Sequence, residues 1–388
     1  INGFGFSGNG DRIGTVIVDT YEASPFKDMG TANPNGSQRY YIGHVDWTGF
    51  NGLVEYTGSD KFSAVLQVGT SSQKYQWEGF YTAAPSTLSR KITVTGGYIK
   101  GGANYRANDN SNFFFNVGQI MRPPSFDGVF PNADYDFEEA DEILNESFTS
   151  FELGYGFRSS NFKGTVNAYH TVWGDRTLRR STSIDDQGVR IIYSGVEQTH
   201  QGIEAEMTWY PSSRLRVKGM ASLGNWKYTK NFQGDSYFID NNQPAGTTGT
   251  LYLDGVKIGD AAQTVLYLGL DYKLSSKLSI DLDMMSYDDL HGRFGPLDSE
   301  FNSDNNRGSV KLPSFGTTDL GATYRFNLLG YETLARLNVN NLFDEEYISQ
   351  SQTNFHNDGG RTWNGVNVEN QVYFGKGTTW NLGLNIKF

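Results

Sequence analysis

The C-terminal end of the chain alternates strictly between apolar and polar residues. From position 380 onward the odd positions hold Asn, Gly, Asn and Lys, and the even positions are Trp380, Leu382, Leu384, Ile386 and Phe388. A period of two residues predicts a β-strand with one apolar and one polar face. The pattern alone leaves two settings open, because the apolar face can lie in the core of a soluble sandwich or meet lipid on an outer-membrane barrel.

Similar patterns along the rest of the chain predict a series of strands, many of them ten residues or longer. They lie at 45–56, 62–78, 91–106, 112–122, 148–158, 162–172, 200–210, 214–228, 262–273, 277–286, 314–326, 331–343 and 379–388. Strands of soluble proteins are usually about five or six residues long. The predicted strands are therefore long for a soluble fold.

The gaps between these strands alternate between short and long. The short gaps are "TGSDK", "ANDNS", "SSN", "PSS", "LSS" and "NLLG", and the long ones are 79–90, 123–147, 173–199, 229–261, 287–313 and 344–378. Tandem soluble sandwiches give no reason for such alternation. An up-and-down membrane barrel does, because its short turns face the periplasm and its long loops face the outside.

Charged residues avoid one of the two faces of the predicted strands. In the strand at 277–286, Ile280 and Leu282 share the apolar frame, whereas Asp281 and Asp283 lie in the other frame. A lysine or arginine facing lipid at mid-bilayer would cost about 2–4 kcal/mol, so this exclusion favours lipid exposure. We therefore predict an all-β fold, an antiparallel up-and-down transmembrane β-barrel. The charges of both signs in the polar frame suit a wet lumen or a polar plug.

Composition narrows the possible functions. The 388 residues include 46 Gly but only 10 Pro, and no Cys, which excludes disulfides and Cys-based metal or catalytic sites. The formal net charge of −11 argues against a nucleic-acid partner. No apolar run is long enough for a transmembrane helix.

Candidate catalytic and metal-binding chemistry is sparse. The five histidines are scattered without metal-ligand spacing such as HExxH. The acidic run "DYDFEEADE" at 134–142 lacks the residue order of a calcium loop and is better interpreted as a solvated loop. We therefore predict no catalytic residue, no bound cofactor and no metal site, and a protein that is not an enzyme.

Several Gly-, Asn- and aromatic-rich segments follow one another along the chain. They are "GGANYRANDNSNFFFNVG" (101–118), "FFNVGQIMRPPSFDGVF" (114–130), "NESFTSFELGYGFRSSNFKGTVNAYHTVWGDR" (145–176), "QGIEAEMTWYPSSRLRVKGMASLG" (201–224) and "NVNNLFDEEYI" (338–348). Together they resemble TonB-dependent receptors, in the form common among Bacteroidetes-type bacteria. The resemblance covers 101–224 and 338–388 well and the remainder loosely. It implies a 22-stranded barrel, an N-terminal plug inside it and a TonB-contacting segment ahead of the plug.

The chain departs from that plan in its first part. No plug-like segment precedes the strand at 45–56, and thirteen strands fall short of 22. We expect residues 1–44 to be an extracellular loop or the remnant of a preceding strand, and 45–388 to be the C-terminal strands of a larger barrel whose plug is not in this chain. The alternative is that "RIGTVIVDTYEA" (12–23) adds a fourteenth strand to a small, complete barrel.

The resemblance also implies a function and a set of partners. It points to an outer-membrane receptor that imports a scarce, bulky nutrient and is energised from the inner membrane by the TonB system. Outer-membrane lipid, the barrel-assembly machinery and a surface lipoprotein are further candidate partners. The terminal strand, Trp380 to Phe388, resembles the assembly signal of outer-membrane barrels. The alternative function is a non-transporting barrel, either a passive pore or a structural subunit of a surface complex.

The last long loop supplies the candidate ligand contacts. Its aromatic and imidazole side chains are Tyr347, Phe355, His356, Trp363 and Tyr373, among many asparagines. Aromatic faces and amide groups together suit sugars or peptides. The alternative is that these side chains pack against one another within the loop.

Overall fold

The computed structural model describes most of the chain. The described residues are 2–6, 12–17, 41–79, 87–130, 143–184, 187–238, 243–246, 249–295 and 298–387. Among them the helices are α1 (Phe126–Val129) and the 3-10 turn η1 (Ser299–Asn302), of four residues each. No helix in this part of the chain has the length and apolar character needed to cross a membrane.

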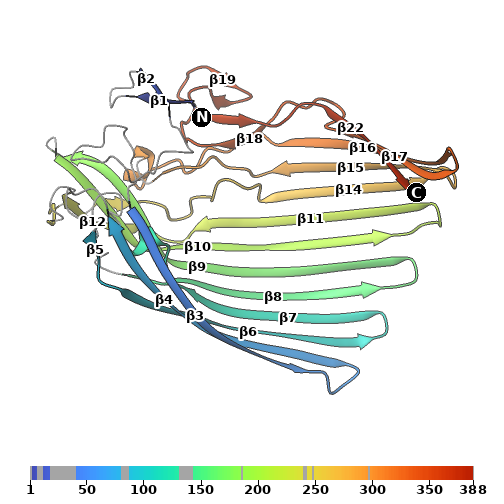
Figure 1. The fold of residues 1–388 in the computed structure, drawn as a ribbon, viewed down its shortest axis with the longest axis horizontal. Helices are drawn as coiled ribbons and strands as arrows, with labels where there is room; N and C mark the ends of the chain where they lie inside the picture. Colours follow the sequence, from blue (N-terminus) through green and yellow to red (C-terminus); the bar gives the residue numbers. More distant parts are fainter. Residues whose placement is uncertain are drawn as a thin grey trace. The chain divides into compact units, whose positions relative to one another are not determined.

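One large sheet contains all the predicted strands, in chain order (Figure 1). They are β3 (Tyr41–Tyr56), β4 (Phe62–Gly79), β6 (Ile92–Asn108), β7 (Ser111–Arg122), β8 (Glu146–Arg158), β9 (Phe162–Ile184), β10 (Gln187–Trp209), β11 (Leu215–Tyr228), β14 (Thr264–Lys273), β15 (Leu278–Asp288), β16 (Phe315–Leu328), β17 (Tyr331–Asn340) and β22 (Thr379–Lys387). Every strand pairs with the next one along the chain in this series, and the order ends at β3 and β22. The prediction of an antiparallel up-and-down sheet is confirmed.

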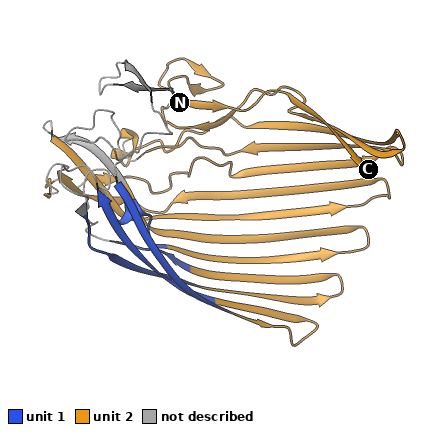
Figure 2. Ribbon diagram, in the orientation of Figure 1, with its two compact units in different colours: residues 1–52, 68–98, 120–146 blue, residues 53–67, 99–119, 147–388 orange. Residues whose placement is uncertain are grey.

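The chain divides into two compact units (Figure 2). Unit 1 contains 1–52, 68–98 and 120–146, and unit 2 contains 53–67, 99–119 and 147–388. In unit 1, Tyr75 and Trp77 of β4 pack with Val129 and Phe130 in a small core beside α1. All the site residues described below belong to unit 2.

Shorter strands lie beside the large sheet or apart from it. β5 (Thr87–Leu88) pairs with β4, and β12 (Phe232–Phe238) pairs with both β10 and β13 (Gly249–Leu251). The last long loop contains two further pairs, β18 (Ile348–Ser351) with β21 (Val372–Phe374) and β19 (Thr362–Trp363) with β20 (Val366–Asn367).

The segment considered as a fourteenth strand pairs elsewhere. β2 (Arg12–Ile17) forms a separate two-stranded sheet with β1 (Asn2–Phe6), and the remainder of 12–23 lies outside the described residues. The acidic run at 134–142 also lies outside them. The assignment of 1–44 therefore stays a prediction.

Cross-strand register separates the two faces of the sheet as the sequence predicts. Leu282 lies opposite Leu270 on one neighbouring strand and opposite Leu320 on the other. Asp283 lies opposite Gly269 and Asp319 in the same way. Since side chains alternate along each strand, these pairings build a continuous apolar face and a continuous polar face.

Ion pairs connect the strands across the polar face. Arg216 Nε lies 2.9 Å from Asp271 Oδ2, and Lys218 Nζ lies 3.3 Å from the same oxygen. Arg336 bonds Asp281 through both guanidinium NH2 groups, with 2.7 Å between Nη2 and Oδ2. The apolar face carries exposed side chains instead, for example Leu382 and Leu384, which are 61% and 62% exposed. An apolar face this exposed suits lipid better than water.

The prediction of a long loop at 173–199 is wrong. β9 and β10 continue through it as a hairpin, paired from Arg176–Val196 to Ile184–Gln187. Val189, Ile191 and Tyr193 alternate along this extension and are buried in a core with residues of the following loop. The register shifts between Tyr193 and Gln198, around Gly195 with φ +70°, and this irregularity interrupts the alternation that would have revealed the strand.

Candidate ligand-binding site

Three neighbouring strands place aromatic and amide side chains in one row at the loop end of the polar face. Gln198 on β10 lies directly opposite Trp173 on β9 and Tyr228 on β11. By alternation these three side chains share a face with Glu204 and Lys218, which lie further down the same strands. The row therefore forms the loop-end border of the polar face.

A pocket opens above this row. Its volume is about 420 Å³, within the usual range for small-molecule sites. Trp173, Gln198 and Tyr228 line it from the sheet, together with His200. The rest of the lining includes parts of three loops, Ile258–Gly259–Asp260, Arg293–Phe294–Gly295 and Gln352. We call the segment 255–263 the roof of this pocket.

Backbone hydrogen bonds attach the roof to β11. The Tyr228 N–H donates to the Val256 carbonyl at 3.0 Å, and the Gly255 N–H donates to the Tyr228 carbonyl at 3.1 Å. The Ile258 N–H donates to the Trp226 carbonyl, also at 3.1 Å. Tyr228 thus lines the pocket through its side chain and supports the roof through its backbone, and Trp226 supports the roof through its backbone.

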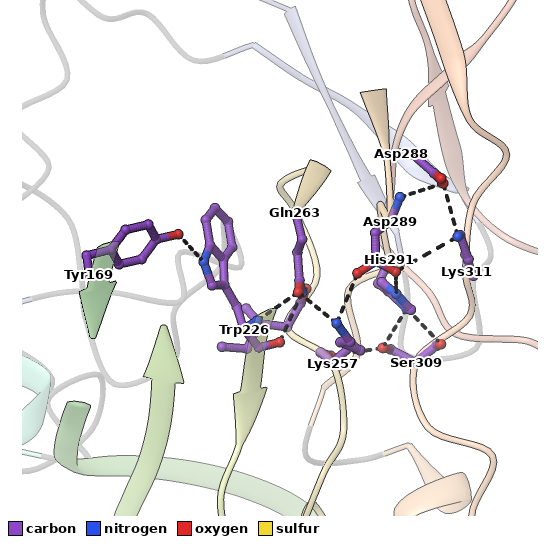
Figure 3. Close-up of polar contacts among 10 residues, drawn as sticks. Tyr169, Trp226, Lys257, Gln263, Asp288, Asp289, His291, Ser309 and Lys311 are labelled. Atoms are coloured by element: carbon purple, nitrogen blue, oxygen red, sulfur yellow. Dashed lines mark hydrogen bonds and ion pairs between the residues drawn. The ribbon is translucent and has the colours of Figure 1, made fainter. Parts of the chain in front are cut away.

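Gln263 fixes the end of the roof (Figure 3). Its side chain is 1% exposed, and its carbonyl oxygen accepts from the Trp226 N–H at 2.7 Å and from Lys257 Nζ at 3.0 Å. Its amide nitrogen donates to the carbonyls of Trp226 and Ile258 at 3.0 and 3.2 Å. Trp226 in turn donates from Nε1 to the Tyr169 hydroxyl at 2.8 Å, which links the roof to β9.

A second part of this network connects the roof to the loop after β15 (Figure 3). Lys257 Nζ lies 2.9 Å from Asp289 Oδ2, and the other oxygen of Asp289 lies 3.1 Å from His291 Nε2. His291 Nδ1 is 3.1 Å from the Ser309 carbonyl, and the Ser309 hydroxyl donates to the Lys257 carbonyl at 2.9 Å. Burial raises the pKa of Asp289, but the bonds from Lys257 and His291 outweigh it and hold that pKa below its ordinary value.

Two arginines give the pocket its charge. The Arg176 guanidinium lies 3.9 Å from the centre of the Trp173 ring and interacts with the Tyr228 hydroxyl. Arg293 Nε lies 3.8 Å from Asp260 Oδ2, whose partner oxygen Oδ1 accepts from the Gln350 side chain at 2.9 Å. The arrangement can bind an organic ligand through guanidinium, amide and hydroxyl groups beside apolar walls.

The five ligand-contact candidates in the last long loop do not line this pocket. Tyr347 stacks on Phe315 with 4.1 Å between ring centres, and Trp363 packs edge-on against Phe374 at 5.0 Å. His356 Nε2 is 3.0 Å from the Gly308 carbonyl oxygen.

The remaining two candidates, Phe355 and Tyr373, are each 50% exposed. The structure thus shows packing within the loop for Trp363, whereas Tyr347 packs on β16, and the contact of any of the five with ligand stays a prediction. The same loop does contribute Gln352 to the pocket.

The terminal strand adopts the predicted alternation. Trp380, Leu382 and Leu384 lie opposite Val339, Leu337 and Ala335 on β17, and Ile386 lies opposite Thr333. Phe388 lies outside the described residues. The role of this strand in assembly stays a prediction.

Sequence reasoning missed the pocket because its residues are scattered from Trp173 to Gln352 and form no contiguous motif. One usable signal was present. Trp226 and Tyr228 occupy the polar frame of β11, where their large rings are out of place unless they meet another part of the protein or a ligand.

The comparison with protein families shows to which family the chain belongs. The family described as "TonB dependent receptor-like, beta-barrel" matches residues 2–342. The chain belongs to the TonB-dependent receptor β-barrel family. The suspected family and the barrel fold are thereby confirmed, whereas the Bacteroidetes-type form stays a prediction.

Solved structures of two receptors and a transporter share this fold. The siderophore receptor PiuA from Acinetobacter baumannii matches with a TM-score of 0.64 at 15% identity, over 90% of this chain and 44% of that protein. The copper transporter OprC matches with 0.58 at 14%, over 90% and 50%. The ferric yersiniabactin uptake receptor FyuA from Yersinia pestis matches with 0.58 at 13%, over 90% and 47%. No curated protein sequence matches the chain.

The chain spans no more than half the length of these three neighbours. Their likeness, at this level of identity, shows the barrel fold of the TonB-dependent receptor family and nothing about a shared substrate. It agrees with the expectation of thirteen strands from a larger barrel.

Proposed function

We propose that the chain is the barrel portion of an outer-membrane importer that takes up a scarce, bulky nutrient and is energised through TonB. The observation that supports this most directly is the pocket at the loop end of the polar face, in a member of the TonB-dependent receptor family. The neighbours named as a siderophore receptor and a copper transporter favour transport over a structural role.

Uptake measurements separate this proposal from the passive pore. Cells that carry the complete parent gene are compared with a deletion strain for uptake of a panel of nutrients, with and without TonB. The importer proposal requires uptake that is lost in both the deletion strain and the strain without TonB. Uptake that persists without TonB, together with swelling of protein-containing liposomes in small neutral solutes, would establish the pore instead.

The direction of the strands is part of the proposal. We expect the short turns to face the periplasm and the long loops to face the cell exterior. Because the chain has no cysteine, single cysteines at Ser160 in a short turn and at Asn305 in a long loop are directly comparable. A membrane-impermeant maleimide added to whole cells should label the cysteine at position 305 and spare the one at 160, and the reverse pattern would invert the orientation.

Two proposed partners, the barrel-assembly machinery and a surface lipoprotein, can each be tested. Deleting residues 380–387 should leave the parent protein unassembled and sensitive to protease if the terminal strand is recognised by the barrel-assembly machinery. Copurification of the detergent-extracted parent with a surface lipoprotein would favour a two-component uptake complex. Copurification without any uptake would instead favour the structural-subunit alternative.

A further inference from the structure

We propose that the pocket selects ligands that carry a carboxylate, or an oxyanion of similar size, next to a planar apolar group. This inference rests on the proposed function and names the substrate class of the same site. It is carried by the charge balance of the pocket lining and by the apolar wall that faces it.

Arg176 provides a guanidinium that no carboxylate of the described residues neutralises. Its partners in this part of the chain are the Trp173 ring, at 3.9 Å, the Tyr228 hydroxyl and, through its charge, His200. The guanidinium lies over the indole ring, and a guanidinium held in this way can still bind a carboxylate through two parallel N–H···O hydrogen bonds. Tyr228 is buried, at 8% exposure, and Arg176 is half-buried beside it in the pocket lining.

Arg293, from the loop after β15, adds a second positive charge to the lining. It interacts electrostatically with Tyr228, as Arg176 does. Its partner Asp260 is 3.8 Å away and shares its carboxylate with Gln350, so the lining has two guanidinium groups for one carboxylate. A local excess of positive charge in a chain of net charge −11 is not a consequence of composition, and an anion would neutralise it.

The apolar part of the lining favours a flat group beside the anion. Phe294 packs on Phe301 with 4.2 Å between ring centres and on Tyr228 with 5.7 Å, so two aromatic neighbours hold its ring in place. Leu178 and Ile258 complete this wall. A neutral saccharide would leave the excess positive charge of the lining without an anionic partner. A pocket of about 420 Å³ suits one recognition group of a larger nutrient.

Two probes of equal size test the inference. Calorimetric titrations of the full-length parent protein in detergent would compare 2-naphthoate with neutral 2-naphthamide. We expect the carboxylate to bind about tenfold more tightly, because hydrogen bonds to charged groups are stronger than those between neutral groups. Arg176→Gln should remove this preference by weakening naphthoate binding while leaving naphthamide binding unchanged. Arg293→Gln should act in the same direction, and Arg325→Gln, an exposed arginine outside the pocket, should have no effect.

Several results would overturn the inference. These are equal affinity for the two probes, an unchanged preference in both pocket variants, an equal loss in the Arg325 variant, or no saturable binding of either probe. If one pocket variant does not assemble, as judged by heat-modifiable gel mobility, the other provides the test. Probe binding without TonB-dependent uptake would refute only the proposed function, and TonB-dependent uptake without a preference for the carboxylate would refute only this inference.

Discussion

Replacing Gln263 with leucine tests whether the roof is fixed by one buried amide. Leucine fills a similar volume but cannot accept the Trp226 N–H or donate to the Ile258 carbonyl, which lie 2.7 and 3.2 Å from the native amide. The Trp226 carbonyl keeps its bond from the Ile258 N–H, and Lys257 keeps Asp289. The loss therefore concentrates on two backbone groups.

The expected cost follows from those two groups. Leaving the Trp226 N–H without an acceptor costs about 1–3 kcal/mol, and the lost bond to Ile258 adds about 1 kcal/mol. The free energy of opening the roof should fall by about 2–4 kcal/mol in total. Local amide exchange would then be about 30-fold to 1,000-fold faster.

Hydrogen exchange followed by mass spectrometry on the full-length protein measures this directly. Peptides covering 255–263 should lose protection, whereas peptides from β14 to β17 should not change. Gln350→Leu is the matched control, because among the described residues the Gln350 side chain makes a single hydrogen bond, to exposed Asp260 at 2.9 Å. Unchanged exchange in the roof of the Gln263 variant, or an equal change in both variants, would show that the amide does not hold the roof.

Three further predictions concern the strands and the loops. Leu282→Lys should cost about 2–4 kcal/mol in a refolding titration if it faces lipid near mid-bilayer, whereas Thr317→Lys on the polar face should cost far less, and equal costs would contradict the assigned faces. Gly321→Ala should destabilise the barrel by about 1–3 kcal/mol because its methyl group would meet the polar-face ion pair, whereas Gly383→Ala meets open space, so a neutral result at both positions would refute the crowding. Hydrogen bonds from Arg307 lower the pKa of Glu300 from 4.5 to about 2, so the loop that contains these two residues should be fully protected from hydrogen exchange above pH 4.5 and lose protection as the pH falls towards 2. Glu300→Gln should remove this pH dependence, and its persistence would exclude Glu300 as the source.

The strands could be predicted from the sequence because one physical constraint acts on every second residue. Because lipid excludes charge from one face, the residue type alone assigns Leu282 to the apolar face and Asp283 to the polar face, without any knowledge of their neighbours. Val189 and Ile191 are buried by other loops instead of by lipid, and they still alternate with their neighbours. The register shift around Gly195 then separates this short alternating stretch from the rest of β10. The prediction therefore failed at 173–199, where the local pattern is broken.

The pocket could not be predicted because its geometry depends on pairing between distant segments. Gln198 meets Tyr228 through strand register, and Asp260 meets Arg293 through two separate loops. The aromatic residues of the last long loop were reasonable ligand candidates by composition. However, Tyr347 stacks on Phe315, and only a structure identifies that partner.

The pocket and its roof are energetically linked, because residues of β11 serve both. Tyr228 contributes its ring and hydroxyl to the pocket and its backbone to the hydrogen bonds that hold Gly255 and Val256. A ligand that requires a closed roof binds with an apparent affinity reduced by the fraction of closed molecules. While the closed state dominates, weakening Gln263 should accelerate exchange in the roof and leave affinity unchanged. Affinity should begin to fall only when the loss approaches the whole free energy of closure, so the two measurements together determine how stable the closed roof is. A fall in affinity without faster exchange would mean that Gln263 acts on the ligand by some route other than the roof.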